Sequence, residues 1–274
     1  MTFIYHASTA LKVNRVGDVV QVECALLNNN TEASAWVFAD VKTLQIQQAA
    51  WALYRSDDRE LGVFELPELI GVEAYLNAGP ILKSVLGGPG QEMPRELVAD
   101  CFRVMVQAET FFFEERGYKT AEKYVEFWHQ NYAGLCRYYS HFDEIDKHWP
   151  AWLANTKRSY NLFNRNKTIT IQRQQMDFII TASFIDSFHH VHLGIRLDQF
   201  GQVQTASGNF INAPHKNCHE NTEHLPKIIG LNLPALSKRE IAALVGGPDG
   251  CTHLLELIGD AASALAFMPP FVQS

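Results

Sequence analysis

The feature that most constrains this chain is an internal repeat. Residues 66–89 align with residues 225–248 without a gap, and seven of the 24 columns are identical. Unrelated segments would share roughly one or two identities at average residue frequencies. The alignment therefore predicts a duplicated unit, against the alternative that two similar helix ends arose independently. The identical columns are Leu66/Leu225, Pro67/Pro226, Ile70/Ile229, Gly71/Gly230, Gly87/Gly246, Gly88/Gly247 and Pro89/Pro248.

Each copy is preceded by segments with the alternation and the β-branched content of strands. These segments are residues 19–27, 36–48, 176–185 and 190–206. The last of them belongs to an expected hairpin, formed by 189–198 and 202–211, that turns at Asp198-Gln199-Phe200-Gly201, where glycine supplies a positive φ. Strands followed by segregated helices, twice over, predict the α+β class rather than a doubly wound parallel sheet.

The helices of the second copy have clear start and stop signals. Ser237 and Glu240 have the spacing of a capping box, which opens a short helix. Gly246-Gly247-Pro248 ends it, because glycine accepts a left-handed conformation and proline cannot continue a helix. A final helix is expected from about Cys251 to Phe267.

The segment between the copies has a different composition. Residues 102–165 carry 16 of the 31 aromatic residues, and the spacing of Tyr124, Phe127, Trp128, Tyr132 and Leu135 predicts an amphipathic helix. The rings can form a seam between two half-domains or line a pocket for a planar or hydrophobic ligand. We therefore expect three parts: a degenerate first repeat (1–101), an aromatic helical connector (102–165) and a second repeat (166–274).

Composition and charge exclude several classes of function. Lys plus Arg number 23 against 30 acidic residues, a net charge of -7, and no basic run could neutralise a row of phosphates. Nucleic acid is therefore not an expected partner. The chain has no long apolar run and no signal-peptide pattern at its start, so we expect no membrane association and a cytoplasmic location. Five cysteines without framework spacing indicate reduced thiols.

Histidine and cysteine concentrate in one quarter of the chain. Seven of the eleven histidines and two of the five cysteines lie between residues 189 and 253. Imidazole and thiolate are ligands that zinc and iron prefer. The spacing is not that of a zinc finger, so any site must be assembled from separate elements. The cluster consists of His189, His190, His192, His215, Cys218, His219, His224, Cys251 and His253.

Geometry selects four of these as candidate metal ligands. On a strand His190 and His192 project to one face and His189 to the other. Cys218 follows the hairpin, and Cys251 and His253 lie at the start of the last helix. A helix N-terminus is expected to lower the pKa of the Cys251 thiol and favour thiolate. The expected ligands are therefore His189, Cys218, Cys251 and His253, with Cys251 and His253 also the catalytic candidates. The alternative is a set of unrelated buried side chains.

The tail of the chain resembles a known family at this point. Its sequence, LVGGPDGCTHLLELIGDAASALA over residues 244–266, resembles a bacterial family catalogued as a domain of unknown function, whose hallmark is a Gly-Gly turn followed by Gly-Cys-Thr-His-Leu. The resemblance covers roughly residues 185–267 and points to His189 and Cys218 besides Cys251 and His253. The order of elements is also similar to that of iron-sulfur cluster scaffold proteins, which place three metal-binding residues at corresponding points.

Three functions remain open on the sequence. The first is a small-molecule enzyme, a lyase or hydrolase, with a zinc, iron or thiolate centre that acts on a hydrophobic or aromatic substrate. The second is a non-catalytic metal or ligand carrier. The third is a metal-free enzyme that uses acid-base groups such as Glu256 or Asp260. Nucleotide cofactors are not expected, because the Gly-Gly-Pro segments follow helices and read as caps.

Overall fold

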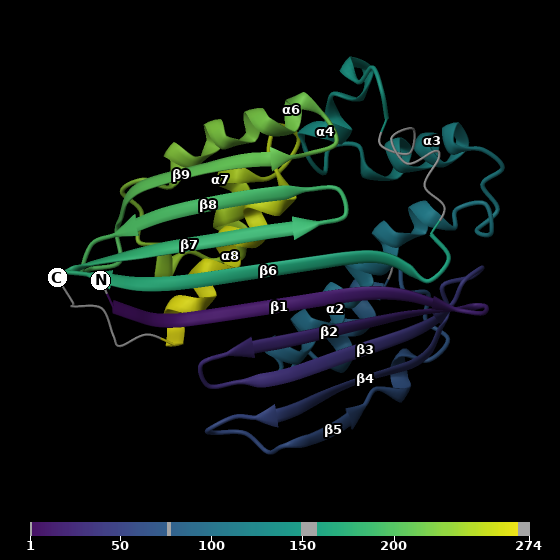
Figure 1. The fold of residues 1–274 in the computed structure, drawn as a ribbon, viewed down its shortest axis with the longest axis horizontal. Helices are drawn as coiled ribbons and strands as arrows, with labels where there is room; N and C mark the ends of the chain where they lie inside the picture. The colour runs from purple at the N-terminus through teal and green to yellow at the C-terminus, as the bar shows by residue number, and fades with distance from the viewer. Residues whose placement is uncertain (1, 76–77, 149–157, 268–274) are drawn as a thin grey trace. The chain divides into compact units, whose positions relative to one another are not determined.

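The computed structural model describes residues 2–75, 78–148 and 158–267. Its fold is a mixed α and β one built on a large antiparallel sheet, with helices that follow the strands along the chain (Figure 1). The contacts group the chain into two compact units. The first comprises Met1–Ala7, Val125–Trp152 and Lys167–Ser274, and the second comprises Ser8–Tyr124 and Leu153–Asn166.

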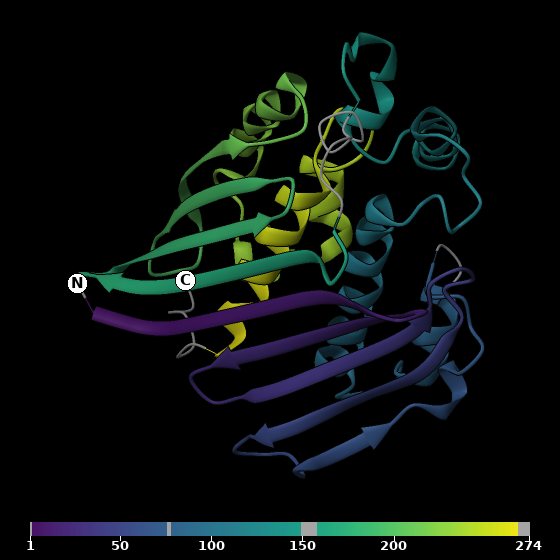
Figure 2. The ribbon, with the colours of Figure 1, turned by 45° about the vertical axis from the view of Figure 1, so that its right-hand side comes forward.

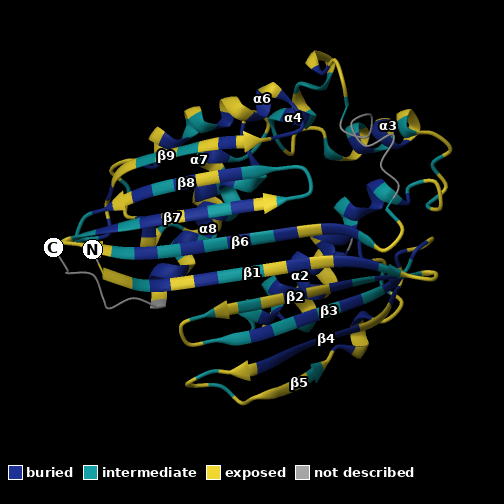
Figure 3. Cartoon of the chain, in the orientation of Figure 1, coloured by how far each residue is buried: buried dark blue, intermediate teal, exposed yellow. Residues whose placement is uncertain are grey.

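The second unit contains β5, β4, β3, β2 and the part of β1 from Ser8 onward, and the strands follow that order in the sheet. Their bounds are Thr2–Val16 for β1, Val19–Asn28 for β2, Glu32–Asp40 for β3, Ile46–Arg55 for β4 and Gly62–Glu65 for β5. A 3-10 turn at Pro67–Leu69 leads to α1 (Ala78–Val85) and α2 (Glu92–Ala108), and α2 packs on β2 and β3. Residues along β3 alternate between buried and half-buried, so one face of this part of the sheet forms the core under α2 (Figure 3).

The first unit also has strands followed by helices. Its strands are β6 (Asn161–Gln174), which belongs to this unit from Lys167 onward, β7 (Asp177–Asp186), β8 (His190–Leu197) and β9 (Val203–Asn212). A helical turn α6 (Lys216–His219) and a 3-10 stretch (Glu220–Ile228) follow, then α7 (Lys238–Val245) and α8 (Thr252–Ala264). Helix α8 packs on β7 and β8 and runs behind these strands in both ribbon views (Figures 1 and 2). The other α-helices among the described residues are α3 (Ala121–Tyr132) and α4 (Arg137–Ser140).

The turn signals of the second copy are confirmed. Gly201 has φ +84° in the β8–β9 turn, and Asp198 accepts hydrogen bonds there from the backbone N–H groups of Phe200 (2.9 Å) and Gln202 (3.0 Å). The capping box of Ser237 and Glu240 is formed at the start of α7. The strand expected over 36–48 is broken between β3 and β4, and the strands β1, β5 and β6 were not expected.

That break is caused by a local turn. The Asp40 carboxylate accepts from the N–H groups of Lys42 (3.0 Å) and Thr43 (2.8 Å), and the Leu44 N–H donates to the Asp40 carbonyl (2.8 Å). Leu44 adopts φ +54° and is fully buried. This Asx-type turn therefore interrupts the strand, although the residues on both sides of the turn have a β-branched pattern.

No helix in the described ranges combines the length and the apolar character that crossing a bilayer requires.

Candidate metal centre

A tight turn places the start of α8. A Cβ atom on Gly250 would lie 2.3 Å from the carbonyl oxygens of both Val245 and Gly246, so only glycine fits there. The Cys251 N–H donates to the Val245 carbonyl at 2.7 Å, which folds the chain back against the end of α7. Cys251 thereby becomes the N-cap residue of α8, and His253 lies in its first turn.

A second turn places His189 at the end of the β7–β8 hairpin. The Asp186 N–H donates to the His189 carbonyl at 2.8 Å. Asp186 Oδ1 accepts from the N–H groups of Phe188 (2.8 Å) and His189 (2.7 Å), and this side chain is fully buried. Val191, two residues after His189, is buried in the core whereas His192 is exposed. Strand alternation therefore directs His189 and Val191 to the face that α8 covers.

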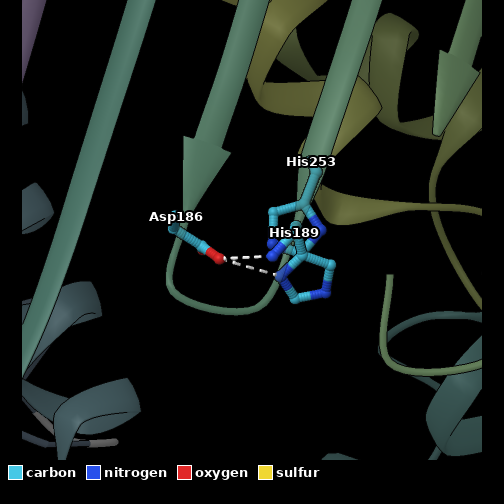
Figure 4. Close-up of side chains that lie close together, drawn as sticks. All are labelled: Asp186, His189 and His253. Carbon is cyan, nitrogen blue, oxygen red and sulfur yellow. Dashed lines mark hydrogen bonds and ion pairs between the residues drawn. The ribbon is translucent and has the colours of Figure 1, made fainter. Parts of the chain in front are cut away.

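The two turns bring Asp186, His189 and His253 together (Figure 4). One candidate ligand atom from each of these residues lies within 4.8 Å of the other two. Each residue is half-buried when its backbone and side chain are counted together. The imidazole rings of His189 and His253 have centroids 4.0 Å apart, and the buried Phe184 ring supports His253 at 4.6 Å. Among the described residues, this is the one group of three or more His, Cys, Asp or Glu side chains with that spacing.

Hydrogen bonds orient both imidazoles. His189 Nδ1 lies 3.2 Å from Asp186 Oδ1, so its Nδ1–H donates to the carboxylate and Nε2 keeps a free lone pair. His253 Nδ1 lies 3.9 Å from the Cys251 sulfur, which is within range of a weak hydrogen bond to sulfur. Partners of this kind fix the tautomer and ring orientation of metal-binding histidines.

The four ligands expected from the sequence are placed as follows. His189 and His253 belong to the three-residue group, and Cys251 contacts His253. Cys218 lies buried in α6, outside that group, but close enough that its charge would raise the pKa of Cys251. Asp186 was missed by the sequence reasoning. Its signal is an aspartate at the end of a strand, three residues before a histidine, where a carboxylate can bond the following backbone N–H groups.

The expected activation of Cys251 is wrong. Burial raises the pKa of this thiol well above its ordinary value, and the N–H groups of Leu254 and His253 lower it only in part. Burial likewise raises the pKa of Cys218 to about 12. The helix N-terminus is present as predicted, but desolvation of a fully enclosed thiolate outweighs it.

The acid-base candidates Glu256 and Asp260 are committed to an ion pair. Both lie on α8, and the buried Lys167 ammonium of β6 lies 2.7 Å from Glu256 Oε1 and 3.0 Å from Asp260 Oδ2. This arrangement ties α8 to the sheet one turn beyond His253.

An aromatic cluster adjoins the start of α8. The Arg137 N–H donates to the Gly250 carbonyl at 2.9 Å, so α4 lies against the turn that precedes Cys251. The Trp128 ring stacks on Tyr132 with centroids 4.2 Å apart, and on Tyr139 at 5.9 Å. The sequence thus predicted a cluster of rings that the fold does assemble. Its members are Trp128, Tyr132, Tyr138, Tyr139 and Phe142.

Comparison with known proteins gives one family match. Residues 169–266 match the model of a family described as "Protein of unknown function (DUF2889)". The matched range holds the whole candidate metal centre and the Gly-Cys-Thr-His-Leu motif at residues 250–254. Residues 169–266 are therefore similar to a family described only as one of unknown function. No curated protein matches the chain, and no solved structure does either.

Proposed function

We propose that the chain is a metal-dependent enzyme that acts on a small organic molecule, with zinc or iron(II) held by Asp186, His189 and His253. The observation that carries this proposal is the convergence of one carboxylate and two imidazoles within 4.8 Å. Two histidines and one carboxylate form the ligand set of catalytic zinc sites and of non-haem iron sites, and three protein ligands leave positions open for substrate.

The spacing is compatible with one ion. Two donor atoms that each lie about 2.1 Å from a metal are at most about 4.2 Å apart. A small rotation of the histidine side chains is therefore enough to close the centre from the observed arrangement. When bound, the ion would supply Lewis-acid chemistry, which polarises a carbonyl or activates water.

Each residue has its own part in this proposal. The buried Asp186 provides a negative charge that offsets a cation, and its backbone hydrogen bonds keep the carboxylate fixed. His253 presents Nε2, because its Nδ1 faces Cys251. His189 presents Nδ1, the atom that faces Asp186, and an ion would take the place of its proton. The raised pKa of Cys251 favours this metal-centred form over a thiolate nucleophile. The aromatic cluster next to the start of α8 supports an aromatic or otherwise apolar substrate.

Metal content tests the proposal directly. We expect protein purified without chelator to hold close to one equivalent of zinc or iron by elemental analysis. His189→Ala, His253→Ala and Asp186→Ala should each lose it, whereas the control His192→Ala, on the same hairpin but exposed, should keep it. Equal metal content in all four variants would refute the centre. Retained metal without turnover of any small organic substrate would instead make the chain a carrier.

Two cysteine variants also test the proposal. Cys218→Ala should keep the metal, because Cys218 lies outside the three-residue group. Cys251→Ala should weaken metal affinity by about 10- to 100-fold, the usual cost of removing the partner of a ligating histidine. Loss of the metal in Cys218→Ala would instead favour the four-ligand set expected from the sequence, and with it the likeness to iron-sulfur scaffold proteins.

We further infer that the two strand-then-helix parts arose by duplication. Besides the seven identical columns, the element starts support it: β1 begins at residue 2 and β6 at 161, and α2 begins at 92 and α8 at 252. Ile46 and Val203 also make matching backbone hydrogen bonds. The N–H of Ile46 donates to Val72 and that of Val203 donates to Leu231, each at 2.9 Å. The described part of the first half has no counterpart of the metal centre, which fits a supporting role.

The net charge of -7 and the free state of all five cysteines support a cytoplasmic protein without a nucleic-acid partner.

A further inference from the structure

Apart from the candidate metal centre, the first unit contains a group of buried polar atoms that lack the hydrogen-bond partners which buried groups require. Arg137 Nη1, both side-chain polar atoms of Asn217, and Asn221 Oδ1 are buried and have no hydrogen-bond partner within the described chain. Asn217 is 3% exposed and Asn221 is 2% exposed. Buried carboxamides are nearly always hydrogen-bonded, because an unpaired one loses its bonds to water without compensation. We therefore expect a bound molecule to supply the missing hydrogen-bond partners of these four atoms.

These atoms belong to two short segments that pack on one another. Arg137 Nη2 lies 3.3 Å from Glu220 Oε2, so the guanidinium reaches the helical turn that carries both asparagines. The Tyr138 ring meets the His215 ring edge-on at 6.5 Å. His215 in turn accepts the backbone N–H of Asn217 at 3.4 Å and begins α6.

We propose that Arg137, Asn217 and Asn221 bind a small organic acid that carries a hydroxyl or amino group next to its carboxylate. Arg137 Nη1 and Asn217 Nδ2 are donors and suit the carboxylate. Asn217 Oδ1 and Asn221 Oδ1 are acceptors and need a ligand donor. A simple anion would leave both carbonyl oxygens unpaired, whereas an α-hydroxyl can donate to one of them and an α-ammonium group to both. The pattern of donors and acceptors therefore selects an α-hydroxy or α-amino acid.

This site is separate from the proposed metal centre and does not depend on it. None of its residues belongs to the group of Asp186, His189 and His253. Binding can therefore be measured in chelator-treated protein, where failure of the metal proposal has no effect on the result.

Calorimetric titration of the chelator-treated protein with L-lactate, L-alanine and propionate tests the ligand class. Propionate matches lactate without its hydroxyl. We expect lactate or alanine to bind, and propionate to bind at least about tenfold more weakly, since it leaves the asparagine carbonyls unpaired. Equal affinity for propionate, or no binding of either lactate or alanine, would overturn the proposal.

Two near-isosteric variants test the residues. Asn217→Leu removes two atoms that have no partner in the ligand-free protein, so its thermal midpoint should stay the same or rise while lactate binding is lost. Asn221→Leu should also lose lactate binding, but it removes the hydrogen bond from Asn221 Nδ2 to the Cys218 carbonyl (2.9 Å) and should lower the thermal midpoint. The control is Asn131→Leu, an exposed helical asparagine that should leave binding unchanged. If ordered waters alone satisfy these groups, Asn217→Leu will lower the thermal midpoint and lactate will not raise that of the wild type. That outcome contradicts the site.

Discussion

A buried carboxylate in the second unit gives a quantitative test of the energetics. Glu109 is fully buried. Its Oε2 accepts from the hydroxyls of Tyr75 (2.8 Å) and Tyr124 (3.0 Å), and its Oε1 accepts from Arg116 Nε (2.7 Å). The perturbation is Glu109→Gln, which keeps the shape of the side chain and removes its charge.

The expected cost follows from these contacts. Removing one partner of a buried ion pair costs about 3–5 kcal/mol, because the other charge is left uncompensated. Arg116 retains Glu73 at 3.0 Å and the Lys42 carbonyl at 2.6 Å, so the cost belongs at the lower end of this range. We therefore expect Glu109→Gln to lower the free energy of unfolding by about 3 kcal/mol. Tyr124→Phe removes one hydrogen bond to a charged group and should cost about 1.5–3 kcal/mol.

Urea denaturation of the two single variants and of the double variant measures these terms. The control is Glu114→Gln, which changes an exposed glutamate in the same segment. The double variant should lose less than the sum of the single losses, because both changes act on one network. A loss below about 1 kcal/mol for Glu109→Gln, or full additivity, would refute the view that this carboxylate is the centre of the network.

Three further predictions concern the first unit. Lys167→Met should lower the free energy of unfolding, measured in urea, by about 2–3 kcal/mol. This is less than the cost for a fully enclosed ion pair, because the Asp260 side chain is 32% exposed, although Glu256 is better buried. A change no larger than that caused by replacing a surface lysine would contradict this prediction. Cys251 should react with iodoacetamide at least about tenfold more slowly in the native protein than in urea, because its raised pKa keeps the thiol protonated. Peptide mass spectrometry measures both rates, and equal rates would contradict the raised pKa. The pKa of His141 is raised by its hydrogen bond to Asp249 and, to a smaller extent, by its hydrogen bond to Glu144. His141 should therefore stabilise the folded protein fully below the ordinary histidine pKa of about 6.5, and this contribution should disappear as pH rises through the raised pKa. In urea unfolding across this pH range, His141→Gln should lack this pH-dependent part of the free energy of unfolding. The same pH profile in the variant and the wild type would exclude the contribution of His141.

Short-range signals in the sequence predicted the local structure well. The β8–β9 turn requires Gly201 and uses the Asp198 carboxylate, and both residues act within four positions of each other. Ser237 and Glu240 cap α7 across three residues. Such features depend on backbone geometry and on nearby side chains, so the sequence contains their whole cause.

The candidate centre was predictable only in part. His189 and His253 stood out by residue type, and strand alternation placed His189 on the correct face. Asp186 did not stand out, because an aspartate after a strand is common in turns that bind nothing. The pKa of Cys251 was predicted in the wrong direction because the helix terminus is visible in the sequence whereas the burial of the thiol is not.

The sequence by itself determined that strands precede helices in each half, the turn and the helix cap of the second copy, and which residue types were available for chemistry. Tertiary structure decided which of those residues meet. His189 and His253 are 64 positions apart in the sequence, yet their ring centroids lie 4.0 Å apart because the β7–β8 turn and the start of α8 pack together. The enclosure of Cys251 also arises from that packing. Contact and desolvation are set by distant segments, and for that reason no local pattern encodes them.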